Sequence, residues 1–150
     1  LQGWSRLSVL ERAALWSIAH ATPSEPLTGR GLGLKPTENQ ARMNQMATDP
    51  FVIKRMRADA FYGLVRLMDD AWARADEVKT PVLIVFGQKD DIAPVAPAQE
   101  LAQRLGQRAR FISYPSGHHL LLHGSEREQV YGDVLSAFER AILPEGANAF

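Results

Sequence analysis

The stretch from Pro81 to Leu122 constrains the fold of this chain more than any other. It opens with a run of uncharged residues, 81–86, which is typical of a strand buried on both faces of a parallel sheet. A helical pattern over 98–105 follows, and then a second apolar run, 110–114. Strand, helix and strand in this order predict a β-α-β unit with two parallel strands.

Each predicted strand is followed by a glycine-containing turn that carries a reactive type of side chain. Asp90 and Asp91 come soon after the first strand, and His118 and His119 come soon after the second. The carboxyl ends of parallel strands meet at one edge of a sheet, where reactive groups collect. An Asp and a His at that edge could form the acid and the base of a nucleophile–base–orienter triad.

Other interpretations of these residues stay open at this point. A Gly-x-x-Asp-Asp sequence is also an ordinary polar turn, and Asp91 is the second candidate for the acid. A histidine after a strand is often structural, and His118 is the second candidate for the base. His119 and His123 have helical spacing, but no acidic or cysteine ligand lies nearby in sequence, so neither a metal site nor a cofactor is predicted.

The two strand-end sequences resemble the acid and base elements of α/β-hydrolases, most closely in the branch of monoacylglycerol lipases and lysophospholipases. The acid element is Gly87-Gln88-Lys89-Asp90, and the base element is Tyr114-Pro115-Ser116-Gly117-His118-His119-Leu120-Leu121-Leu122. Two sequences in the first half, 27–31 and 49–53, resemble the helical cap of the same branch. The resemblance covers nearly the whole chain.

The resemblance implies a fold class, a division of the chain and two site residues. The class is α/β, as the C-terminal half of an α/β-hydrolase fold with two parallel strands and flanking helices, preceded by a helical cap. The cap would comprise 1–57 and the core part 58–150. Asp90 would orient the imidazole, and His119 would act as the general base.

Several helices are predicted from capping signals and helical spacing. Ser8 and Glu11 form a capping box that opens a helix to about Ala21. Asp49-Pro50 predicts the start of another helix, and Asp59 the cap of a longer one. The apolar face of this longer helix should pack on a sheet. Two sets of residues are expected to face inward: Phe61, Leu64, Val65, Met68, Trp72 and Ala75, and, in the last helix, Tyr131, Val134, Leu135, Phe138 and Ile142.

A nucleophile with the expected local sequence is not found. The family uses a serine in Gly-x-Ser-x-Gly, and no serine here has both glycines. The chain begins at Leu1, and α/β-hydrolases are roughly twice as long, so we expect a missing N-terminal half. Two parallel strands alone would also leave an apolar edge uncovered, which independently predicts an N-terminal half or a partner chain.

Composition excludes several other classes of function. The chain has 150 residues and a formal net charge of zero, with no basic stripe that would indicate nucleic-acid binding. It has no cysteine, which fits a reducing, cytoplasmic location. No apolar run approaches the ~20 residues of a membrane-spanning helix. The expected partners are a small lipid-like ester and, through the cap, the surface of a membrane.

Two hypotheses of function follow. The first is a serine ester hydrolase for monoacylglycerol or lysophospholipid-like esters, to which this chain contributes Asp90 and His119. The second is a non-catalytic fragment or subunit that completes its sheet with another chain. The family also contains epoxide hydrolases, dehalogenases and C–C hydrolases, because a fold does not determine the chemistry.

Overall fold

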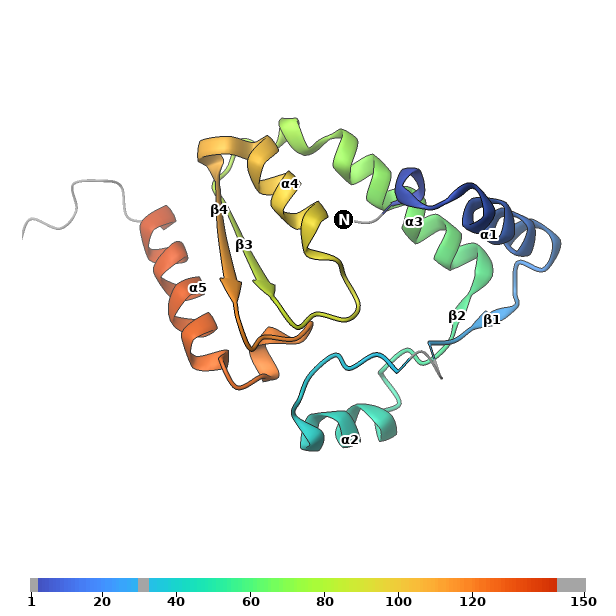
Figure 1. The fold of residues 1–150 in the computed structure, drawn as a ribbon, viewed down its shortest axis with the longest axis horizontal. Coiled ribbons are helices and arrows are strands. Elements are labelled where there is room, and N and C mark those ends of the chain that lie inside the picture. The colour runs from blue at the N-terminus through green and yellow to red at the C-terminus, as the bar shows by residue number, and fades with distance from the viewer. Residues whose placement is uncertain (1–2, 30–32, 143–150) are drawn as a thin grey trace, which may run out of the picture.

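The computed structural model describes residues 3–29 and 33–142, which form helices around two small sheets (Figure 1). The α-helices are α1 (Val9–Ala21), α2 (Gln40–Thr48), α3 (Ala58–Ala73), α4 (Val95–Leu105) and α5 (Arg127–Ile142). The strands are β1 (Pro26–Leu27), β2 (Met56–Arg57), β3 (Val82–Gly87) and β4 (Ala109–Tyr114). Short 3₁₀ turns lie at Trp4–Arg6, Ala75–Glu77, Gly106–Arg108 and Leu121–His123.

The predicted β-α-β unit is present. β3 and β4 pair in parallel from Val82↔Ala109 to Gly87↔Tyr114, and α4 connects them. Gly106 ends α4 with φ 60°, a left-handed conformation that favours glycine. α4 and α5 flank the strand pair on opposite sides (Figure 1).

The side chains of β3 are less buried than a central strand requires. From Val82 to Phe86 they are only half-buried. Within the part of the chain that the structure describes, β3 pairs with β4 alone. The apolar side chains of β3 are therefore only partly covered by the described residues.

The buried centre of the β-α-β unit lies between the strands and α5. Tyr114 and Val130 are fully buried, and Leu121 packs with them. Val85, Ile112 and Val134 pack against this cluster and are partly buried. The cluster includes Leu121 of the loop that follows β4, so it anchors that loop to the core.

The predicted inward face of α5 is wrong for most of its members. Tyr131, Leu135 and Phe138 are exposed, and the side chain of Ile142 lies outside the described residues. Val134 packs against the core as predicted, together with Val130, which was not among the predicted residues. Apolar residues occupy two neighbouring faces of α5, and the described residues cover only one of them.

The long helix α3 forms as expected, but its apolar face packs mainly on a helix and not on the parallel sheet. It packs chiefly against α1 (Figure 1), with Val65 buried on α3 and Leu15 and Ala19 buried on α1. Phe61 and Leu64 stay exposed. The expectation that this face packs on a sheet is therefore wrong.

Capping signals predicted one helix start well and two poorly. The Ser8–Glu11 capping box is present at the start of α1. No helix forms after Asp49, because its Oδ1 accepts a hydrogen bond from the Phe51 backbone N–H at 2.8 Å and closes a turn instead. The chain then runs into β2, which pairs antiparallel with β1. Asp59 lies in the first turn of α3, while Arg57 holds the cap position.

Candidate active site

The loop after β3 holds the carboxylate of Asp90 in a fixed orientation. Its Oδ1 accepts hydrogen bonds from the backbone N–H groups of Ile92 at 2.8 Å and Ala93 at 2.9 Å. The Asp90 N–H in turn donates to the carbonyl of Gly87 at 3.2 Å. One carboxylate oxygen is thus committed to the loop, and Oδ2 is left for another partner.

The loops after β3 and β4 meet backbone to backbone. The Lys89 N–H donates to the Gly117 carbonyl at 2.9 Å, and the Gln88 N–H donates to the Tyr114 carbonyl at 2.9 Å. A Cβ atom at Gly87 would lie 2.6 Å from the His118 carbonyl oxygen and would clash with Gly117 as well. Glycine at position 87 is what permits this approach.

The approach brings Asp90 and His119 into contact. Nδ1 of His119 lies 2.8 Å from Oδ2 of Asp90, across 29 residues of sequence. The side chain of Asp90 is 5% exposed and that of His119 is 41% exposed. Because an ionised carboxylate only accepts hydrogen bonds, Nδ1 carries the proton, and in the neutral ring Nε2 keeps a free lone pair.

The environment keeps Asp90 ionised. Burial raises the pKa of its carboxyl group, but the hydrogen bonds from Ala93, His119 and Ile92 outweigh burial, so the pKa lies below its usual value. An ionised carboxylate that accepts from Nδ1 leaves Nε2 as the ring nitrogen that can take up a proton. The pair therefore suits proton uptake at Nε2, which is the task of a general base.

The alternative site residues lie elsewhere. The ring of His118 faces Glu38, with Nε2 3.9 Å from a carboxylate oxygen of Glu38. Asp91 is exposed, and no hydrogen bond or ion pair forms on it among the described residues. His20 stacks on Trp16, in the cap. No group of three His, Cys, Asp or Glu in residues 3–29 and 33–142 is arranged to hold a metal ion.

The sequence does not identify Glu38 as a residue near the candidate site. Glu38 precedes α2 and reaches the loop after β4, where its Oε1 accepts a hydrogen bond from the Ser125 N–H at 2.6 Å. The two residues are 87 positions apart, and no local pattern connects them. Only the folded arrangement reveals the contact.

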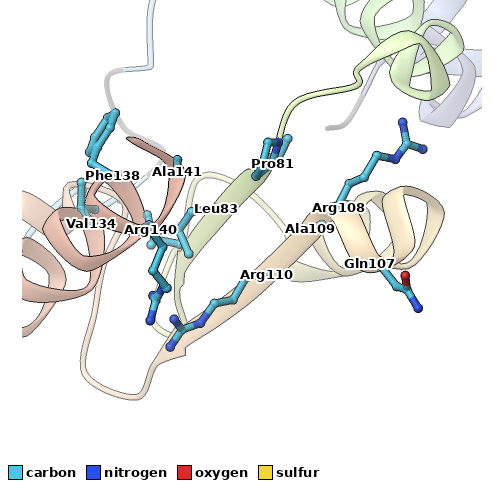
Figure 2. Close-up of a pocket in the computed structure, with 13 residues that line it drawn as sticks. Pro81, Leu83, Gln107, Arg108, Ala109, Arg110, Val134, Phe138, Arg140 and Ala141 are labelled. Carbon is cyan, nitrogen blue, oxygen red and sulfur yellow. The ribbon is translucent and has the colours of Figure 1, made fainter. Parts of the chain in front are cut away.

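A pocket of about 510 Å³ lies at the start of the strands β3 and β4 (Figure 2). Leu83 of β3, Arg110 of β4, and Val134 and Phe138 of α5 line it. Asp90 and His119 follow the opposite ends of the two strands. This pocket is therefore separate from the candidate active site.

A second pocket lies beside the β1–β2 sheet and the start of α3. Its volume is about 430 Å³, and its lining includes Leu27, Ile53, Met56 and Phe61. These side chains come from β1, β2, the segment before β2 and the start of α3. The pocket is largely apolar.

Comparison with known families places this geometry in context. The family model for serine aminopeptidases of family S33 matches residues 2–127. The chain belongs to this family of α/β-hydrolases. The family assignment confirms the α/β-hydrolase resemblance and the predicted fold class, and it supports a hydrolase. No curated protein matches the chain.

Solved structures of two lipases share the fold of this α/β-hydrolase chain. The monoacylglycerol lipase of Paleococcus ferrophilus matches with a TM-score of 0.74 and 20% identity, over 87% of this chain and 52% of that one. A soluble variant of the monoglyceride lipase of Saccharomyces cerevisiae, in complex with a substrate analogue, matches with a TM-score of 0.67 and 17% identity, over 89% and 50%. The chain thus spans about half the length of these lipases.

None of the helices in residues 3–29 and 33–142 is both long enough and apolar enough to cross a bilayer.

Proposed function

We propose that this chain supplies the acid and the base of a serine ester hydrolase that acts on monoacylglycerol or lysophospholipid-like esters. The observation that carries the proposal is the 2.8 Å hydrogen bond between His119 Nδ1 and Asp90 Oδ2, and Nε2 forms no hydrogen bond within residues 3–29 and 33–142. The same arrangement of acid, base and ring nitrogen activates a serine in triads on several unrelated folds.

In this mechanism His119 takes up and releases a proton twice. Nε2 takes the proton of the serine hydroxyl as its oxygen bonds to the acyl carbon, and then gives that proton to the leaving alcohol when the ester bond breaks. Nε2 next takes a proton from water, which attacks the acyl-enzyme, and returns it to the serine as the fatty acid leaves. Asp90 holds the ring and stabilises its protonated form throughout.

The serine is proposed to lie in a part of the protein outside this chain. No serine here has the Gly-x-Ser-x-Gly sequence, and the chain spans about half of the two lipases. The same part would pair with β3 along its uncovered edge. It would also cover Tyr131, Leu135 and Phe138 on α5 and fill the neighbouring pocket of Figure 2.

The cap supports the choice of a lipid-like ester. The 430 Å³ pocket is lined mainly by apolar side chains that could hold an acyl chain, with Lys54 and Arg55 also in its lining. Phe51 is 93% exposed and Ile53 is 77% exposed, and Lys54 and Arg55 follow them directly. Apolar side chains beside cations suit contact with an anionic membrane surface. A chain without cysteine suits action at the cytoplasmic side.

Labelling with a fluorophosphonate probe tests the proposed nucleophile. The full-length protein should take up one probe on a serine upstream of position 1, and His119→Ala should abolish the labelling. It should hydrolyse long-chain monoacylglycerols and lysophospholipids. Absence of labelling in a folded full-length protein would refute the serine mechanism and leave hydrolases of other chemistry, such as epoxide hydrolases and dehalogenases.

The second candidate is a non-catalytic subunit whose sheet is completed by another chain. The half-buried, singly paired β3 is the observation that favours it. Mass spectrometry of the native protein distinguishes the two. One long polypeptide that includes these residues supports the enzyme, whereas a separate short chain in a hetero-complex supports the subunit.

A further inference from the structure

The segment just before α2 is bound to the loop that carries His119. The Leu120 N–H donates to the Pro36 carbonyl at 2.7 Å. The side-chain amide of Asn39 donates to the His123 carbonyl at 3.2 Å, while its Oδ1 caps α2. Residues 36–39 are called the clamp segment here, and residues 117–125 the base loop. They are far apart in sequence but in direct contact.

Glu38 makes the central contact of the clamp segment. Its Oε1 accepts the Ser125 N–H at 2.6 Å, and its Oε2 lies 3.9 Å from Nε2 of His118. The carboxylate also lies against Gly124, where a Cβ atom would approach Oε1 to 3.2 Å. Burial raises the pKa of Glu38, but hydrogen bonds from its own backbone and from Ser125 more than offset this and lower the pKa. The contact is thus made by a carboxylate.

The base loop is also held from its other side. The Gly117 carbonyl accepts from Lys89, in the loop that carries Asp90, and the Ser116 N–H donates to Oε2 of Glu126 at 2.8 Å. His119 therefore lies between a backbone contact to the acid loop at Gly117 and one to the clamp segment at Leu120. Its ring is 41% exposed. The position of the ring depends on its hydrogen bond to Asp90 and on the backbone that carries it.

We propose that Glu38 is a positioning residue that keeps His119 aligned with Asp90 through the base loop. The proposal rests on the proposed function, since it concerns the base of that reaction. Within the described residues no contact joins Glu38 to His119 or Asp90, so Glu38 acts through its contacts with His118, Gly124 and Ser125 of the base loop. The clamp segment leads directly into α2. A displacement of α2 would therefore be passed through the clamp segment to the base loop that carries His119.

Hydrogen exchange tests the clamp without any substrate. In the full-length protein, Glu38→Ala should speed exchange at the Ser125 amide by about tenfold or more, since it removes a hydrogen bond to a charged acceptor. It should also weaken the NMR signal of the His119 Nδ1 proton. Glu38→Gln keeps an oxygen for Ser125 and should restore both. The matched control is Glu128→Ala, because the ion pair of Glu128 is with its neighbour Arg127 on the surface of α5.

Ester turnover tests the effect on the base. Glu38→Ala should lower kcat by about tenfold with KM changed less than about twofold, because alignment and not substrate binding is lost. Glu38→Gln should recover most of this, and Glu128→Ala should match the wild type. If Glu38→Ala does not fold, Gly124→Ala serves instead, since its Cβ crowds the carboxylate without removing it.

The outcomes separate the two proposals. Unchanged exchange at Ser125, or faster exchange with an unchanged Nδ1 proton signal and an unchanged kcat, would overturn the positioning role. A wild-type protein without ester turnover would overturn the proposed function instead. The exchange and Nδ1 signals would still decide whether Glu38 holds His119 against Asp90.

Discussion

The phenol oxygen of Tyr114 lies 2.8 Å from Oδ2 of Asp133 and joins the last residue of β4 to the middle of α5. Tyr114 is fully buried, and the hydroxyl donates to the carboxylate. The base loop begins three residues later. The hydrogen bond therefore fixes the end of the strand from which His119 is presented.

Replacing Tyr114 by Phe should destabilise the protein. The change removes a hydrogen bond to a charged acceptor from a buried site, which costs about 1.5–3 kcal/mol. Urea unfolding of the full-length protein measures the loss. Tyr131→Phe is the matched control: its hydroxyl donates to the Leu122 carbonyl at 3.0 Å from an exposed position, and its loss should cost about 0.5 kcal/mol. Equal losses would contradict the role of burial.

The same tyrosine should make stability fall at high pH. Burial, followed by the hydrogen bond to Asp133, raises the pKa of Tyr114 from 10.0 to about 12. The folded state therefore holds the phenol proton more tightly than the unfolded state. This contribution is complete below pH ~10 and is lost as the pH rises toward ~12. Unfolding at about pH 9 and about pH 11.5 should show a drop that Tyr114→Phe lacks.

Asp90 should make the stability of the protein fall at low pH, whereas Tyr114 makes it fall at high pH. Its folded-state pKa is lowered, so its ionisation stabilises the protein above the ordinary aspartate pKa of about 3.9. That stability disappears as the pH falls through the lowered value. The urea midpoint should fall less between about pH 6 and about pH 3 in Asp90→Asn than in the wild type. Asp91→Asn should keep the wild-type slope, and identical slopes in all three proteins would contradict the assignment.

Ester turnover by the full-length protein should rank the site residues. His119→Ala removes the base and should lower kcat by several orders of magnitude, toward the ~10⁶-fold loss known for other triads. Asp90→Asn permits the wrong tautomer and should cost about 10⁴-fold. Asp91→Asn should leave turnover near the wild-type value, and His118→Ala should change it less than about tenfold. A larger loss in His118→Ala than in His119→Ala would show that the base is misassigned.

Two glycine substitutions should change the stability of the protein in opposite directions. Gly87→Ala places a methyl group against the backbone of Gly117 and His118, and should destabilise the protein by about 3 kcal/mol. Gly132 lies within α5, where an added Cβ atom would meet nothing within 4 Å among the described residues, and Gly132→Ala should stabilise the protein by about 0.5–1 kcal/mol. Thermal unfolding compares the two. Stabilisation by Gly87→Ala would mean that the acid and base loops do not meet as described.

The strand pair and the Asp90–His119 contact could be predicted because each depends on local sequence. The apolar runs, the glycine turns and the spacing between them lie within one β-α-β unit. The packing partners of the apolar faces of α3 and α5 could not be predicted. Helical spacing indicates which face is apolar but not which element covers it. In α5 the helical spacing predicts an inward stripe through Leu135, whereas the fully buried residue is Val130.

Competing local interactions explain the remaining errors. Asp49 before a proline is a sound helix signal, but its side chain bonds the Phe51 N–H and closes a turn. The contact of Glu38 with Ser125 spans 87 residues and has no local signature at all. Long-range polar contacts of this kind lie beyond what periodicity and capping rules can predict.

The direct succession of β3, α4 and β4 has a consequence for how the site assembles. Asp90 and His119 are 29 residues apart, so closing the chain between them costs less entropy than closing the 87 residues between Glu38 and Ser125. Contacts of shorter sequence separation are reached faster than those of longer separation. His119 and Asp90 should therefore meet before any distant segment reaches them. In refolding, the appearance of activity would then report the arrival of the nucleophile, with the proton-transfer pair already in place.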